Sequence, residues 1–135
     1  MSPIEHVNPQ GLHANPAFSQ AIKVQGPHQW VFVGGQNAVT AEGEIVGRGD
    51  VAAQTTRAIE NLKIALEAAG ARPEHVIKMT VYLVSGQPLG AAFAASQQAW
   101  GQPAQPPTLS VLQVAGLAHP DFLVEIEALA AVPED

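Results

Sequence analysis

The segment DVAAQTTRAIENLKIALEAAG, residues 50–70, followed by HVIKMTVYLV, residues 75–84, decides the fold of this chain. In the first segment, apolar side chains return every three or four residues, which predicts an amphipathic helix. Asp50 is suited to cap the start of this helix and Gly70 to end it. In the second segment, apolar and polar residues alternate, which predicts a half-buried strand. A helix followed by such a strand indicates that helices pack on a sheet.

The residues before this segment carry weaker signals. Residues 1–16 contain three prolines and one glycine, and we expect them to form an irregular arm on the surface. Residues 18–24 and 29–36 are two β-prone runs with the turn sequence QGPH between them, which predicts a β-hairpin. Residues 41–49 contain three glycines among charged residues and are predicted to form a loop.

The residues after it predict a second helix and two more strands. Apolar side chains recur at helical spacing over residues 88–100, and Gly101 is suited to end that helix. Residues 108–115 and 122–132 are predicted strands. The expected fold class is therefore α+β, a mixed β-sheet with two amphipathic helices packed on one face, in a single domain over residues 1–135.

The composition argues against several classes of function. The net charge is −6, so we expect no binding to nucleic acid. The chain has no cysteine, no pair of histidines at metal-ligand spacing and no phosphate-binding glycine motif, so we expect neither a metal nor a cofactor. We also expect a cytoplasmic protein with no membrane partner, because residues 1–16 lack signal-peptide features and no apolar run is long enough to span a bilayer.

The distribution of charge points to self-association and limits where an anion can bind. Only 13% of the residues are charged, about half the usual share, so a second copy of the chain is expected to cover part of the surface. All six lysine and arginine residues lie within residues 1–78. An anion-binding site in the second half of the chain must therefore take its positive charge from elsewhere.

Glu125 is the single residue that points most directly to chemistry. It lies at the centre of the most apolar predicted strand, where an ionised carboxylate is costly unless it is paired, hydrogen-bonded or facing a wet cleft. Glu127 falls on the same face of that strand. Two interpretations stay open: a solvated outer face, or a cleft in which the carboxylate positions a water molecule.

In chain order, these motifs resemble one known family. SQAI and VFVGGQ in the predicted hairpin, DVAAQTTRAIENLKIALEAAG, HVIKMTVYL and VEIEALA resemble the RidA/YjgF family of reactive-intermediate (imine/enamine) deaminases over residues 17–131. The resemblance implies a chorismate-mutase-like fold that assembles as a homotrimer, with clefts for a small-molecule ligand between subunits. It also implies hydrolysis of 2-imino acids to 2-oxo acids and ammonia.

The resemblance implies a catalytic role for one residue and substrate contacts for several others. In the family, a glutamate of the last strand holds the attacking water, and this position is Glu125. Backbone groups at a Gly-Gln strand end help to bind the substrate, and this strand end is Gly34, Gly35 and Gln36. The family's arginine after Pro-Ala, which grips the substrate carboxylate, is replaced by Leu109.

Other cleft positions of the family also become apolar. The cleft tyrosine is Phe18, the asparagine of the second helix is Phe93, and Val111 completes the expected substrate-binding set. A leucine cannot replace a guanidinium that holds a carboxylate through two hydrogen bonds. The changes at Phe18, Phe93 and Leu109 all reduce polarity, and they favour an uncharged ligand.

Two explanations of the missing arginine therefore remain. Either the cleft takes a less acidic or uncharged ligand, which we favour, or Arg48 or Arg72 of a neighbouring copy supplies the charge. The leading hypothesis is a hydrolase or deaminase that acts on an imine, an enamine or a related small reactive intermediate through Glu125. The alternative is a non-catalytic small-molecule binder or regulator that uses the same cleft.

Overall fold

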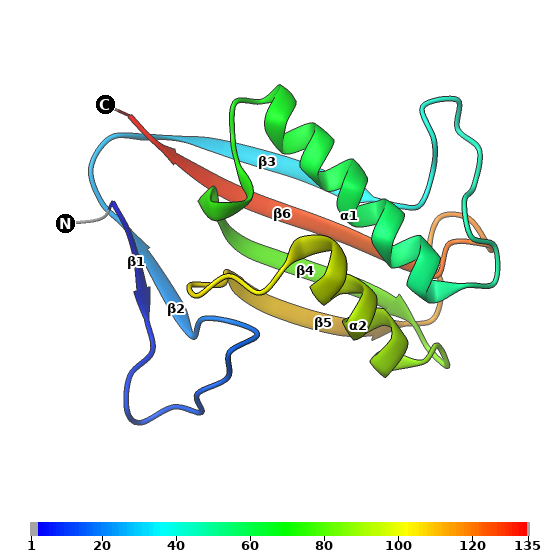
Figure 1. The fold of residues 1–135 in the computed structure, drawn as a ribbon, viewed down its shortest axis with the longest axis horizontal. Helices are drawn as coiled ribbons and strands as arrows, with labels where there is room; N and C mark the ends of the chain where they lie inside the picture. Colours follow the sequence, from blue (N-terminus) through cyan, green and yellow to red (C-terminus); the bar gives the residue numbers. More distant parts are fainter. Residues whose placement is uncertain (1–2, 135) are drawn as a thin grey trace.

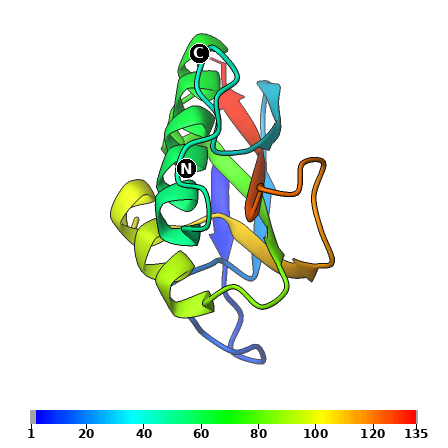
Figure 2. The same cartoon turned by 90° about the vertical axis from the view of Figure 1, so that its right-hand side faces the viewer.

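In a computed structural model, which describes residues 3–134, both α-helices cover the same face of a four-stranded mixed sheet (Figure 1 and Figure 2). The strand order is β3-β6-β4-β5; β4 and β5 run parallel, and the other neighbours are antiparallel. Neither helix of the described residues is long and apolar enough to cross a membrane. The expected α+β class is confirmed. The elements are β1 (Ile4–Val7), β2 (Ala21–Val24), β3 (His28–Gln36), α1 (Val51–Ala68), the 3₁₀ turn η1 (Pro73–His75), β4 (Val76–Val84), α2 (Leu89–Trp100), β5 (Thr108–Val114) and β6 (Val124–Pro133).

Helix α1 forms as its sequence predicts. The side chain of Asp50 accepts a hydrogen bond from the backbone nitrogen of Ala53 at 3.1 Å, and Gly70 follows the helix with a φ of 80°. Ile59, Leu62 and Leu66 are fully buried on the sheet. Each such side chain contributes roughly 1.5–3 kcal/mol by leaving water, more than the helix propensity of any one residue.

Burial under the helices divides the side chains of the sheet into two sets. Val124, Ile126, Ala128 and Ala130 alternate along β6 and lie in the core beneath the helices. We call this side of the sheet the helix face. The opposite side, which we call the open face, carries Glu125 and the alternating side chains of the neighbouring strands, among them Trp30, Phe32, Tyr82, Leu112 and Glu127.

The N-terminal residues differ from the predictions in two ways. Ile4–Val7 forms a strand, β1, so the expected irregular arm is wrong for these residues. β1 pairs with β2 (Ala21–Val24), whereas β3 pairs with β6, so the predicted hairpin between residues 18–24 and 29–36 does not form. The β-prone composition was sufficient to predict strands, but it contained no information about which distant strand each would pair with.

Ser19 fixes the segment before β2 to the start of β5. Its backbone nitrogen donates to the carbonyl of Pro107 at 3.0 Å, and its buried hydroxyl donates to the carbonyl of Pro106 at 2.5 Å. His6 of β1 makes a further hydrogen bond to the same hydroxyl, at 2.8 Å. The β1–β2 pair is thereby held against the chain that enters β5.

Gln54 of α1 is fully buried and connects two loops through its side-chain amide. Its Nε2 donates to the carbonyls of Gly47, at 3.1 Å, and Asp121, at 2.9 Å. Its Oε1 accepts a hydrogen bond from the backbone nitrogen of Leu123 at 2.9 Å. One side chain therefore holds the loop before α1 and the turn before β6, next to the strand that carries Glu125.

We expect Gln54→Leu to lower the free energy of unfolding by roughly 3 kcal/mol, because it leaves three partly buried backbone groups without their hydrogen-bond partners. The matched control is Gln98→Leu on α2, where the side chain is exposed and the change is expected to stay within about 0.5 kcal/mol. Chemical denaturation of both variants measures the difference. Equal stability of the two variants would show that Gln54 does not hold these loops.

Candidate functional site

The carboxylate of Glu125 lies directly against Gly35. A Cβ atom at position 35 would stand 2.6 Å from Cδ and 2.9 Å from Cγ of Glu125, so only glycine allows the side chain to lie there. Gly35 belongs to a β-bulge, because Val33 pairs with Ala128 while Gln36 pairs with Ile126, which leaves one extra residue on β3. The predicted glycine strand end and Glu125 are thus brought together.

Asn37 holds the same carboxylate from the side. Its Nδ2 donates to Oε1 of Glu125 at 3.3 Å. Asn61 of α1 in turn donates to the carbonyls of Asn37, at 3.0 Å, and Val39, at 2.8 Å, and its Oδ1 accepts from Nε of Arg57 at 3.1 Å. Helix α1 therefore fixes the loop that positions Glu125. Sequence reasoning missed both asparagines, and the only available signal was an amide residue directly after a glycine-rich strand end.

Glu127, the second acidic residue of β6 on the open face, has a different partner. The hydroxyl of Tyr82 on β4 donates to Oε1 of Glu127 at 2.6 Å. This hydrogen bond to Glu127, together with burial and the negative charges of Glu127 and Glu125, raises the pKa of Tyr82 above its ordinary value. Glu127 is therefore engaged by a phenol, whereas the hydrogen bond that Glu125 receives comes from an amide.

Because Tyr82 is the only tyrosine of the chain, its ionisation can be followed by ultraviolet absorbance. We expect a titration midpoint above about 10, the ordinary tyrosine value. Glu127→Gln removes the main cause of the shift and is expected to lower the midpoint. Glu125→Gln removes only the smallest of the causes and should lower the midpoint less. The reverse order of the two variants would contradict the assigned hydrogen bond.

A second group of predicted residues lies at a cavity between α2 and the strands β4 and β5. The cavity has a volume of about 250 Å³ and includes Phe93, Leu109 and Val111 in its wall. Its buried floor includes Leu83 and Ile126. Phe18 is not part of the wall, although its neighbours Pro16 and Ala17 are.

The two groups of predicted residues lie on opposite faces of the sheet. Leu109 pairs with Met79, whose side chain is buried on the helix face, whereas Glu125 pairs with Tyr82 on the open face. Directly paired residues of neighbouring strands point to the same side of a sheet. One copy of the chain therefore does not bring Glu125 and Leu109 into one site. The side chain of Gln36 also turns away from Glu125, and donates to the carbonyl of Gly34 at 3.1 Å.

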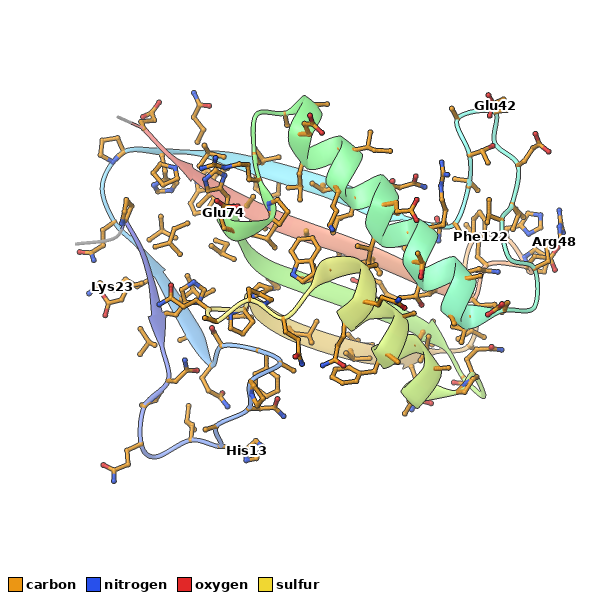
Figure 3. All side chains as sticks on the ribbon, in the orientation of Figure 1. His13, Lys23, Glu42, Arg48, Glu74 and Phe122 are labelled. Atoms are coloured by element: carbon orange, nitrogen blue, oxygen red, sulfur yellow. The ribbon has the colours of Figure 1, made fainter. Side chains whose placement is uncertain are left out.

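The two arginines considered as substitutes for the family arginine have acidic partners in their own chain. Arg48 forms an ion pair with Asp121, in the turn next to Phe122 (Figure 3). Arg72 forms an ion pair with Glu74 at 3.4 Å. All four side chains of these pairs are more than one-third exposed, and such pairs are weak. Each arginine would still have to leave its partner to serve a neighbouring copy.

Comparison with known proteins identifies the family. The model of the family described as Endoribonuclease L-PSP matches residues 9–132, nearly the whole chain. Relatives and solved structures of the same group carry the names RutC, Rid and YjgF. The chain belongs to the RidA/YjgF family. The resemblance drawn from the sequence motifs is therefore confirmed.

Individual members of the RidA/YjgF family match over most of their length. A RutC family protein of Pyrococcus abyssi is 40% identical over 114 residues, which cover 84% of each chain. The conserved Rid family protein YyfB of Yersinia pestis has a TM-score of 0.86 at 33% identity, over 97% of this chain and all of that one. A YjgF/YER057c/UK114 family member of Mycobacterium tuberculosis has a TM-score of 0.62 at 29% identity, over 96% of this chain and 99% of that one.

Proposed function

We propose that this protein hydrolyses the C=N bond of an imine, or of the imine that an enamine forms, in a cleft between subunits of a homotrimer. The observation that carries the proposal is the carboxylate of Glu125, which lies against Gly35 and accepts a hydrogen bond from Asn37. Glycine lets the backbone of the bulge approach a ligand closely, and a carboxylate held beside it can accept a proton from a water molecule. Membership of the RidA/YjgF family supports the same reaction.

The reaction needs one base and one water molecule. Glu125 accepts a proton from water as the water oxygen forms a bond to the imine carbon, and the electron pair of the C=N bond moves to nitrogen. The nitrogen of the resulting carbinolamine takes up the proton from Glu125. The carboxylate of Glu125 then takes the hydroxyl proton of the carbinolamine and passes it to the nitrogen, so that collapse breaks the C–N bond, forms the C=O bond and releases ammonia. Glu125 is regenerated, and the overall change is imine plus water to carbonyl compound plus ammonia.

The apolar side chains of the open face support assembly. Trp30 and Phe32 are 51% and 78% exposed in the single chain, and Leu112 lies exposed on the same face. Monomeric proteins rarely expose aromatic side chains side by side in this way. A second copy that covers this face places its side chains near Glu125. In such packing, the open face of one copy can lie next to the cavity of another.

The substrate is proposed to lack the carboxylate of a 2-imino acid. Leu109 takes the place of the family arginine, and no lysine or arginine follows residue 78. Without a guanidinium, a substrate carboxylate would lose its water shell and gain no charged hydrogen bonds in return. A neutral imine or enamine carries no such penalty.

One observation favours the non-catalytic alternative. The cavity beneath α2 lies on the helix face, away from Glu125 of the same chain. A small molecule can therefore bind in the cavity without meeting a carboxylate. Tight binding of a ligand that is recovered unchanged would assign the protein as a binder or regulator.

The description of the family model names an endoribonuclease, and we do not extend that activity to this chain. The net charge is −6, and an RNA backbone would meet a surface with an excess of negative charge. Only six lysine and arginine side chains are available to neutralise phosphates. We propose a small molecule, and no nucleic acid, as the ligand.

Glu125→Gln tests the catalytic proposal. We expect a loss of ammonia release of at least about 100-fold with a neutral imine generated in the assay, since general-base catalysis contributes about 10²–10⁴. With 2-imino acids made by an amino-acid oxidase, we expect the unmodified protein to release ammonia only slowly. Leu109→Arg should raise this activity, and Leu109→Met, which has similar length without charge, should not. Equal activity of Glu125→Gln and the unmodified protein on the neutral imine would overturn the proposal.

Gly35→Ala tests whether activity depends on the position of the Glu125 carboxylate against Gly35. The added methyl group displaces the Glu125 side chain, whose flexible end can rotate away, so we expect at least a tenfold loss of activity with little change in melting temperature. Gly116→Ala is the matched control, because this residue lies outside the proposed site and no atom lies within 4 Å of a Cβ at that position. Equal losses in the two variants would show that the loss does not come from the position of Glu125.

A further inference from the structure

We infer that the cavity between α2 and the strands β4 and β5 binds the non-reacting part of the ligand, and that this part is an uncharged, ring-sized apolar group with one neutral hydrogen-bonding function. The inference rests on the proposed function in one respect only, namely that the ligand also carries a reacting C=N group. Binding in the cavity does not require turnover, so the two ideas can fail separately.

The wall of the cavity contains no charged side chain. None of the residues that line it is an aspartate, glutamate, lysine, arginine or histidine. Leu89 and Phe93 of α2 and Val111 of β5 are exposed near its opening, while Met79 and Leu83 are buried at its floor. An anion or cation in such a space would lose its hydration and would gain no oppositely charged partner to compensate for the cost. The lining therefore selects against charge.

One lysine contacts a residue of the cavity wall but does not line the cavity. Nζ of Lys63 donates a hydrogen bond to the carbonyl of Ala99 at 2.5 Å and stands 5.9 Å from the ring centroid of Trp100. Trp100 lines the cavity and Lys63 does not. Lys63 thus interacts with the ring and the backbone at the end of α2, and offers no charge to an occupant of the cavity.

Two neutral polar side chains of α2 remain available to a ligand. Ser96 and Gln97 line the cavity and are half-buried, and within residues 3–134 neither side chain makes a hydrogen bond. The hydroxyl of Thr55, also in the wall, already donates to the carbonyl of Val51 at 2.7 Å. A hydroxyl and an amide together can donate to a carbonyl or accept from an N–H group. They match one neutral polar function beside an apolar body.

The size of the cavity fits a ring. An apolar cavity of about 150 Å³ is enough to hold benzene. The volume here is about 250 Å³, which leaves room for a ring with one short substituent. The ring of Trp100 and three prolines of the connection between α2 and β5 form a stiff side of the wall, namely Pro103, Pro106 and Pro107.

The fluorescence of Trp100, which lines the cavity, can report binding. The chain has two tryptophans, and Trp30→Phe leaves Trp100 as the only one. The assembled Trp30→Phe protein is titrated with phenylacetamide and with phenylacetate, which have nearly the same shape and differ in charge. We expect saturable quenching of Trp100 by phenylacetamide, with phenylacetate binding at least tenfold more weakly. Equal or tighter binding of phenylacetate, or no binding of either probe, would overturn the inference.

Three variants in the Trp30→Phe background locate the binding. Ala92→Leu fills the cavity from α2 and is expected to weaken phenylacetamide at least tenfold, whereas Ala91→Leu, at an exposed position outside the wall, should not. Leu109→Arg provides a second test in case Ala92→Leu fails to fold. The added positive charge should make phenylacetate bind more tightly than phenylacetamide. Unchanged affinities in all three variants would place the probe outside the cavity.

The outcomes separate the inference from the proposed function. Binding of phenylacetamide without turnover of any neutral imine supports the cavity and refutes the hydrolase. Turnover that depends on Glu125, with no probe binding in the cavity, supports the hydrolase and refutes the inference.

Discussion

The alternation of side chains along β6 is the constraint on which the rest of the molecule depends. Val124, Ile126 and Ala130 are almost completely buried beneath the helices, so a shift of the strand by one residue would bring Glu125 and Glu127 into the core. Each carboxylate would then cost several kcal/mol unless it lost its charge. The register is therefore strongly specified, and with it the position of both acidic side chains on the open face.

That register would not by itself orient Glu125. The extra residue of the β3 bulge brings Gly35 under the carboxylate, and the absence of a side chain there leaves the space that the carboxylate occupies. Asn61 connects the loop after the bulge to α1, and Gln54 connects the turn before β6 to the same helix. The helix that buries the core therefore also fixes both chain segments that flank Glu125.

Local signals predicted the parts of the fold that are determined locally. Helix α1 with its caps, strand β4 and helix α2 follow from the periodicity of apolar residues and from the residues at their ends. The glutamates in an otherwise apolar strand led to Glu125. The pairing of β2 and β3 was mispredicted, because partner choice depends on β1 and β6, which are distant in sequence. The asparagines at the site were missed because hydrogen bonds to backbone carbonyls leave no periodic pattern. The opposite placement of Leu109 and Glu125 depends on register, which the sequence alone does not give.

The two-sided arrangement makes assembly a condition of the proposed chemistry. Within one chain, the cavity faces the helices and Glu125 faces away from them, so a substrate held in the cavity cannot reach the carboxylate of the same copy. A neighbouring copy packed on the open face is the simplest way to bring its cavity and this carboxylate together. In the proposed reaction, the leucine in place of the family arginine would act on only one half of that shared cleft: Leu109 would change which molecule is held, while Gly35, Asn37 and Glu125 would keep the geometry for attack by water. The residues proposed for specificity and those proposed for chemistry therefore lie on different faces of the sheet, so substitution at Leu109 would alter the first without disturbing the second.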